Sequence, residues 1–149
     1  MSEALEFPPV AELVPHEPPM LLVDELLEWS PEAARVGATI RAGNPFVSDE
    51  RMPASILLEH MAQAIAVANG MADRVAGRSS AELGLLLGTR ELELFCDELE
   101  VGDAIELRVV REFVGDKLAR YACTAARAGE LLARATINVM TTTAEEIRS

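Results

Sequence analysis

The amino-acid sequence predicts an α+β protein in which one curved antiparallel sheet wraps around a single long central helix. The first observation is an apolar helical stretch in the middle of the chain. Between Ala54 and Ala72 it contains no lysine or arginine and one acidic residue, Glu59. A helix that is apolar on nearly all sides is covered by other structure. The second observation is that strand-like segments flank this helix, and a sheet curving around the helix accounts for its composition.

The central helix is expected to run from Pro53 to about Ala76. Proline suits a first helical position because its missing N–H would have no partner there anyway, and the stretch is rich in good helix formers. Ser55, Glu59 and Gln63 follow one another at i, i+4 and therefore form one polar stripe. A carboxylate in such an apolar setting is either hydrogen-bonded for structural reasons or held for acid–base chemistry.

The other elements follow from period-two alternation and from turn residues. A short helix is expected over residues 8–14, a loop from Phe46 to Met52, a turn over residues 97–102, and a frayed tail over residues 141–149. The expected strands are Met20–Glu28, Ala34–Ala42, Leu83–Phe95, Ala104–Phe113, Leu118–Arg127 and Leu131–Met140. Residues 1–149 are expected to form a single domain, with 1–13 as an N-terminal segment.

Composition excludes several classes of function. The formal net charge is −12 and Lys117 is the single lysine, so no basic stripe is available for nucleic acid. The longest apolar run is far shorter than the ~20 residues of a membrane span, and the acidic N-terminus does not resemble a signal peptide. We therefore expect a cytoplasmic protein. Cys96 and Cys123 show no metal-site spacing and are interpreted as small buried side chains, with a disulfide between them left open.

Three stretches of the chain together resemble a known enzyme family. The first stretch, Val14–Asp24, reads VPHEPPMLLVD. In the second, Asn44–Phe46 is followed by Met52-Pro53 and then by Leu58–Gln63, LEHMAQ, and the third is Leu85–Arg90. These segments resemble the 3-hydroxyacyl-acyl-carrier-protein dehydratases of hotdog fold, of the FabZ and FabA type. Leu85–Arg90, LLLGTR, is similar to the strand after the helix in the ApeP-like subgroup, which is associated with aryl polyene biosynthesis.

The resemblance implies dehydration of a 3-hydroxyacyl thioester to the 2-enoyl thioester, in fatty acid or polyene-type biosynthesis, without a metal or bound cofactor. Glu59 matches the acid that protonates the leaving hydroxyl, and His16 is the best candidate for the base. The matching substrate-binding positions are Pro53, Ala54, Ser55 and Gln63. Backbone N–H groups at the helix start are expected to polarise the thioester carbonyl.

The sequence departs from the family where the usual catalytic histidine lies, in a GHFPG-like loop before the helix. Here that loop is shortened to Phe46–Met52 and contains no histidine, and Ala54 replaces the glycine at the helix start. His60 directly follows Glu59, so on a helix it points about 100° away from the acid and is interpreted as a buried or interface residue. His16, in a proline-rich loop, remains the candidate base.

Two other functions stay open on this sequence. One is a hotdog thioesterase, in which Glu59 activates water against the thioester carbonyl. The other is a non-catalytic acyl-thioester-binding subunit that pairs with a competent dehydratase, consistent with the lost histidine. The expected partners are an acyl carrier protein, which presents the acyl group on 4'-phosphopantetheine, or acyl-CoA. A homodimer or a heterodimer with another hotdog subunit is also expected, because pairing removes exposed sheet edges.

Overall fold

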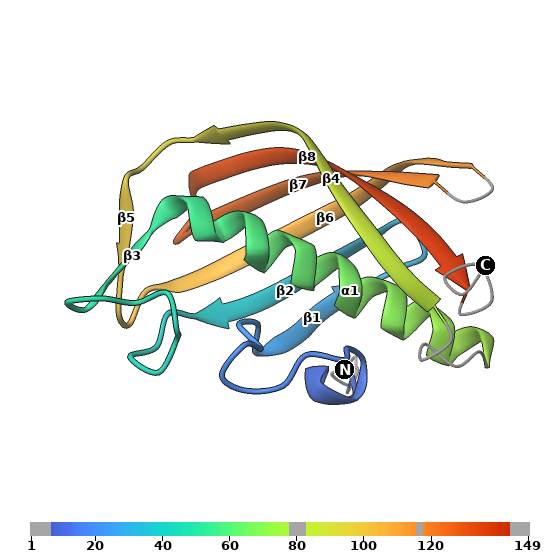
Figure 1. Ribbon diagram of the computed structural model, residues 1–149, viewed down its shortest axis with the longest axis horizontal. Coiled ribbons are helices and arrows are strands. Elements are labelled where there is room, and N and C mark those ends of the chain that lie inside the picture. The colour runs from blue at the N-terminus through green and yellow to red at the C-terminus, as the bar shows by residue number, and fades with distance from the viewer. Residues whose placement is uncertain (1–6, 78–82, 116–117, 144–149) are drawn as a thin grey trace, which may run out of the picture.

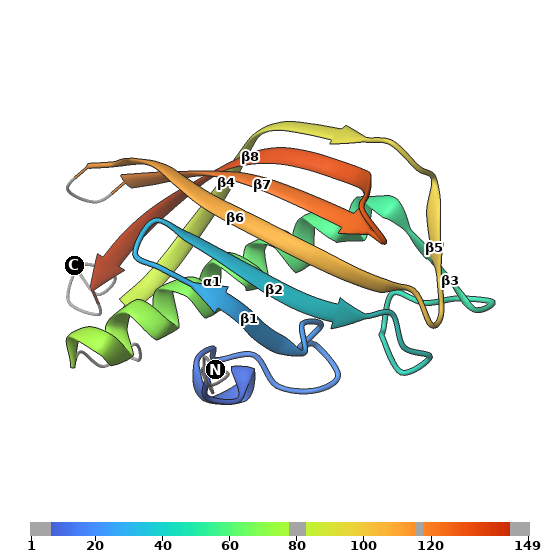
Figure 2. The same cartoon turned by 180° about the vertical axis from the view of Figure 1, so that it is seen from behind.

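A six-stranded antiparallel sheet curves around helix α1, as the sequence predicts, and its strand order is β1-β2-β6-β7-β8-β4. Figure 1 shows α1 along the inner face of this sheet, and Figure 2 shows the outer face. The computed structural model describes residues 7–77, 83–115 and 118–143. The helices are η1 (Val10–Glu12), η2 (Ala54–Ile56) and α1 (Leu57–Ala76), and the strands are β1 (Glu25–Trp29), β2 (Ala33–Thr39), β3 (Arg51–Pro53), β4 (Leu83–Leu94), β5 (Glu98–Glu100), β6 (Ala104–Val114), β7 (Leu118–Arg127) and β8 (Glu130–Thr143).

The core lies between α1 and the inner face of the sheet. Leu57, Met61 and Ile65 of the helix are fully buried. Alternate residues of the strands face them, as Ile105, Leu107 and Val109 of β6 do. Burial of the helix inside one curved sheet explains why its sequence lacks a charged face. Within the described residues, no helix combines the length and apolar character needed to cross a bilayer.

The expected helix start at Pro53 is wrong. Pro53 ends strand β3 and precedes the 3-10 turn η2, and α1 itself begins at Leu57. The reason is tertiary pairing, because Met52 lies opposite Leu99 in a two-stranded sheet of β3 and β5 that sequence periodicity did not indicate. This small sheet lies beside the first turn of the helix (Figure 1). The expected loop 46–52 and turn 97–102 are therefore each partly strand.

Strand boundaries also differ from the expectation, and β2 ends at Thr39 rather than Ala42. Strand β1 begins at Glu25 rather than Met20, because the backbone of Met20 and Leu22 bonds to a helix side chain instead of a neighbouring strand. Strand β8 continues to Thr143 through pairing with β4, so the first three residues of the expected frayed tail are strand. Residues 144–149 lie outside the described part of the chain.

The N-terminal segment is held against the helix at Gly70. A Cβ atom at Gly70 would lie 2.0 Å from the backbone oxygen of Leu13, far inside contact distance. Glycine is therefore required there, although it costs helix stability. Leu13 and Val14 are themselves buried in the core, so the segment that carries His16 begins from a fixed point on the helix.

We expect Gly70→Ala to destabilise the protein by roughly 1–3 kcal/mol, because the added methyl group forces backbone atoms apart. This cost exceeds the gain of about 1 kcal/mol that alanine normally brings inside a helix. The measurement is the free energy of unfolding in urea. Gly43→Ala is the matched control, because a Cβ at Gly43 meets nothing within 4 Å and should change the stability little. Equal stability of both variants and the parent would contradict the close packing at Gly70.

Candidate active site

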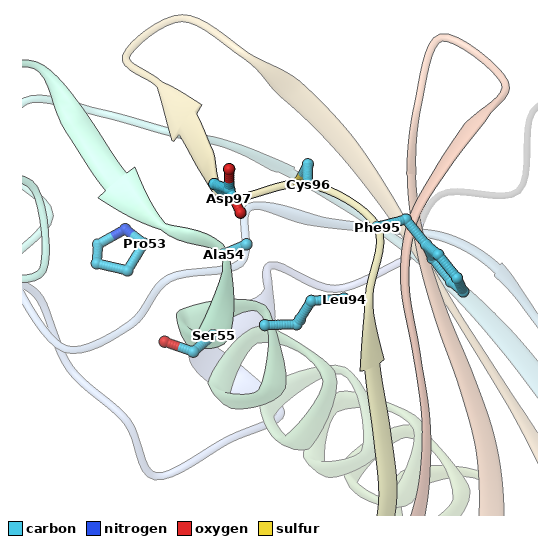
Figure 3. Close-up of a pocket in the computed structure, with 7 residues that line it drawn as sticks. All are labelled: Pro53, Ala54, Ser55, Leu94, Phe95, Cys96 and Asp97. Atoms are coloured by element: carbon cyan, nitrogen blue, oxygen red, sulfur yellow. The ribbon is translucent and has the colours of Figure 1, made fainter.

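An open pocket of about 430 Å³ lies at the start of the helix. One side is formed by Pro53, Ala54 and Ser55, and the other by the segment Leu94–Asp97, which leaves the end of β4. Figure 3 shows this segment passing beside the first turn that carries Ala54 and Ser55. A helix N-terminus presents N–H groups without intrahelical partners and a partial positive charge. The pocket is therefore suited to a carbonyl oxygen that develops negative charge.

One of these N–H groups is already used within the chain. The backbone N–H of Ala54 donates to the carbonyl oxygen of Asp97 at 2.9 Å. This bond clamps the helix start onto the segment after β4 and removes the Ala54 N–H from the donors available to a substrate. Ser55, next along the turn, is exposed in the pocket. The expected substrate-binding positions Pro53, Ala54 and Ser55 all line this pocket. The opposing residues 94–97 were not predicted, because the end of a strand-like segment carries no functional motif there.

Burial increases along the polar stripe from the pocket toward the interior. Ser55 is exposed, Glu59 is half-buried and Gln63 is fully buried. The Nε2 group of Gln63 donates to the Glu59 carboxylate at 3.0 Å. At about 1.5 Å rise per residue, Glu59 lies roughly 6 Å along the helix axis from Ser55. Glu59 and Gln63 are not among the residues that line the pocket, and the oriented carboxylate lies one helical turn from Ser55, which does line it.

Gln63 also holds the N-terminal loop. Its Nε2 donates to the carbonyl oxygen of Met20 at 2.8 Å, and its Oε1 accepts the N–H of Leu22 at 2.7 Å. Both N–H groups of the amide and its oxygen are thus hydrogen-bonded within the chain. The expected substrate-binding residue Gln63 is placed as the group that orients Glu59 and fixes the loop.

His16 lies in the segment between two fixed points on the helix, Leu13 at Gly70 and Met20 at Gln63. Its side chain is half-buried, and its Nδ1 atom is enclosed without a hydrogen-bond partner among the described residues. It is not among the residues that line the pocket at the helix start. The structure therefore brings Pro53, Ala54 and Ser55 together and connects Glu59 to them through the helix, while His16 comes from a separate segment.

His60 is fully buried, as expected for a residue pointing away from the stripe. Its Nδ1 lies 2.9 Å from the carbonyl oxygen of Ile56, and its Nε2 is enclosed without a partner among the described residues. Burial lowers the pKa of His60, opposed by the Ile56 carbonyl and by the charges of Glu59 and Asp24. His60 therefore belongs to the core and is not among the residues that line the pocket.

The two cysteines differ in environment. Cys96 is half-buried at the pocket, and burial raises the pKa of its thiol above the usual value. Cys123 is fully buried in β7, where burial raises its thiol pKa to about 12. Both thiols are free, which resolves the open question of a disulfide. Among the described residues, no group of three histidine, cysteine or acidic side chains is placed to hold a metal ion.

Comparison with known proteins identifies the family. A family profile described as ApeP dehydratase, of the ApeP-like group, matches residues 8–148. The chain belongs to the ApeP-like dehydratase family. It is 28% identical over 144 residues to the 3-hydroxyacyl-[acyl-carrier-protein] dehydratase FabZ of Sinorhizobium medicae, covering 93% of this chain and 90% of that one. It is 30% identical over 115 residues to FabZ of Acetivibrio thermocellus, covering 73% and 74%.

A solved structure supports the same assignment at the level of the fold. The dehydratase heterocomplex ApeI:P from Xenorhabdus doucetiae contains a chain that superimposes with a TM-score of 0.87 at 22% identity. The match covers 96% of this chain and 97% of the other. The hotdog fold expected from the sequence is therefore confirmed.

This ApeP-like chain folds the loop before the helix as a tight hairpin. Ser48 and Arg51 bridge across two residues, Asp49 and Glu50, whose φ angles are 53° and 63°. Such positive φ values belong to a two-residue hairpin turn. The hairpin leads directly into β3, and both acids at its tip are exposed.

We expect N-ethylmaleimide to modify Cys96 in the folded protein and to leave Cys123 unmodified, because only Cys96 reaches the pocket surface. The modification should be slower than that of a free thiol and should accelerate with rising pH, since burial raises the Cys96 pKa. A pantetheine thioester should slow it further by occupying the pocket. Mass spectrometry of tryptic peptides is the measurement, and Cys96→Ser is the control that should take up no label. Labelling of Cys123 before unfolding contradicts this assignment.

We expect stability to fall as the pH drops below the ordinary histidine pKa. Because the folded-state pKa of His60 is lowered, the unfolded chain binds the proton first. The contribution of His60 to the free energy of unfolding is therefore complete above about pH 6.5 and decreases below it, at up to about 1.4 kcal/mol per pH unit. The measurement is the free energy of urea unfolding against pH for the parent and His60→Gln. The pH slope of the parent should exceed that of the variant, and identical slopes would contradict the burial argument.

Proposed function

We propose that this ApeP-like chain is a dehydratase subunit that acts on a 3-hydroxyacyl thioester of an acyl carrier protein, in fatty acid or polyene-type biosynthesis. The observation that carries the proposal is the Glu59 carboxylate held by Gln63 one turn below the helix-start pocket. The family and the FabZ relatives support the same reaction class. A substrate on a carrier protein also implies a cytoplasmic location.

In the proposed reaction, a base removes the proton from C2 of the acyl chain. Glu59, in its acid form, donates a proton to the C3 hydroxyl, which leaves as water while the C2–C3 double bond forms. The helix start at Ser55 stabilises the negative charge on the thioester oxygen. The Ala54 N–H does not contribute, because it is already bonded to the Asp97 carbonyl. These steps are acid–base chemistry and require neither a metal nor a redox cofactor.

The base has two proposed sources. The first is a histidine of a second hotdog subunit that completes the pocket. This source is supported by the described lining of the pocket, which contains no histidine. The structural neighbour is itself a chain of the dehydratase heterocomplex ApeI:P. The second source is His16, whose loop is anchored on the same helix as Glu59. We favour the partner subunit, because the His16 Nδ1 is enclosed by its own chain.

We expect Glu59→Gln to lower the dehydration rate by between about a hundredfold and ten-thousandfold, the range for loss of a general acid. Stability should be retained, since the amide can still accept from Gln63. The assay follows enoyl absorbance from a 3-hydroxyacyl carrier-protein thioester, with the chain purified together with its cellular partner. Glu25→Gln, an exposed acid on β1, is the matched control and should keep full activity.

Parallel measurements separate the alternatives. Release of free thiol in place of enoyl product would identify a thioesterase, and full activity of Glu59→Gln would identify a non-catalytic subunit. His16→Gln in the same complex distinguishes the two sources of the base. A rate close to that of the parent assigns the base to the partner, and a loss as large as that of Glu59→Gln assigns it to His16.

A further inference from the structure

A second, smaller cavity lies beside the second half of α1, away from the pocket at the helix start. It is bounded by the turn between β1 and β2, by Ala68, Asn69 and Ala72 of the helix, and by residues of β6 and β7 that include Tyr121. We call it the Tyr121 cavity. It shares no residue with the first pocket. Its volume of about 10 Å³ is close to that of one water-sized sphere, so it admits a single small ligand and is too small for an acyl chain.

Arg111 brings a positive charge to this cavity from the inner face of the sheet. Along β6 the buried residues Ile105, Leu107 and Val109 face the helix, and Arg111 takes the next inward position. Its side chain lines the cavity and is half-buried. Among the described residues, no acidic side chain forms an ion pair with it. A charge that is partly removed from water without a counter-charge is costly, so this position calls for an anion.

The polar groups around Arg111 leave its charge uncompensated. Tyr121 lies opposite Arg111 in the pairing of β6 with β7, and its hydroxyl donates to Oδ1 of Asn69 at 3.0 Å. Burial raises the pKa of Tyr121, against the lowering effects of the Arg111 charge and of the hydrogen bonds to Asn69 and Arg111. The phenol is therefore neutral at neutral pH. Because Oδ1 of Asn69 accepts from the phenol, its Nδ2 group remains as a donor.

The rest of the described lining offers little that could take the place of an anion. Glu32 is its one acid, and its side chain is exposed and outside ion-pair distance of Arg111. The backbone carbonyl of Glu32 already accepts the N–H of Arg111 at 2.7 Å. The indole Nε1 of Trp29 donates to the Ala68 carbonyl at 3.1 Å. The cavity thus combines apolar and aromatic walls with a cationic donor and an amide donor, which suits a small anion.

We propose that the Tyr121 cavity binds one monoatomic anion of the halide class, such as chloride, held by the Arg111 guanidinium and the Asn69 amide. The anion supplies the counter-charge that the described residues lack, and it connects α1 to β6. The volume of the cavity excludes larger oxyanions such as sulfate. The inference is independent of the proposed function, because neither residue lines the pocket at the helix start.

Trp29 is the single tryptophan of the chain, and it lines the cavity, so its fluorescence reports on the site. Bromide quenches indole fluorescence on contact. The test titrates the full chain with sodium bromide while sodium gluconate keeps the ionic strength constant. We expect a saturable quenching component that chloride competes away. Arg111→Gln should raise the bromide concentration at half saturation by at least about tenfold, the effect of losing one charge-assisted hydrogen bond.

Asn69→Asp is the second variant, because its carboxylate places a fixed negative charge at the position of the anion. The unfolding temperature of the parent should rise with chloride concentration at constant ionic strength, since a ligand that binds only the folded chain stabilises it. Asn69→Asp should show no such rise. Arg108→Gln is the matched control. Arg108 lies on the same strand but is exposed to solvent, so this variant should respond to bromide and chloride as the parent does.

Circular dichroism establishes that each variant is folded. Bromide quenching that is linear in the parent, or equal in the parent and Arg111→Gln, indicates a cavity that holds water only and overturns the proposal. A chloride-dependent rise in unfolding temperature that Asn69→Asp retains also overturns it. If Arg111→Gln does not fold, the parent titration and Asn69→Asp still decide the outcome. The dehydration assay is not involved, so failure here is distinguishable from failure of the proposed function.

Discussion

The candidate site depends on the side-chain amide of Gln63. This single buried group donates to Glu59 and to the Met20 carbonyl and accepts from the Leu22 N–H. An amide buried without these partners would cost on the order of 1–3 kcal/mol for each unmade bond. The same bonds that satisfy Gln63 therefore fix the N-terminal loop and orient the carboxylate. The orientation of Glu59, the proposed catalytic acid, and the anchoring of the N-terminal loop therefore depend on the same side chain.

This coupling is possible because the helix is enclosed. A helix wrapped by the sheet has little solvent to compete for its polar side chains, so hydrogen bonds on it are strong and specific. Burial increases from Ser55 through Glu59 to Gln63, so Glu59 stands between an exposed and a fully buried polar residue. Asp24, at the end of the N-terminal loop, holds the loop against β2 by accepting the N–H of Thr39 at 2.6 Å. The segment that resembles the dehydratase family is thus fixed at both ends.

The fold could be predicted because its main signal, the apolar helix between alternating strands, is long and local. What local pattern could not show was pairing between distant segments. The pairing of Met52 with Leu99 moved the helix start from Pro53 to Leu57. For the site, the i, i+4 stripe predicted Glu59 and Gln63 on one face, but the partners Met20 and Leu22 are 43 and 41 residues away from Gln63. The contact of Asp97 with Ala54 was not predicted either, because the backbone carbonyl makes it and the side chain therefore gives no signal in the sequence.

Two features at the helix start set the chemistry that the pocket can offer. Asp49 and Glu50 form the exposed tip of the hairpin that leads into β3, and the Ala54 N–H is bonded to the Asp97 carbonyl in the segment that follows β4. None of the described residues that line the pocket is a histidine. The Glu59 carboxylate is oriented by Gln63 one turn along the helix from Ser55. In the dehydration proposed for this chain, Glu59 therefore supplies one of the two proton-transfer groups, and the base comes from His16 or from a second subunit, as proposed above.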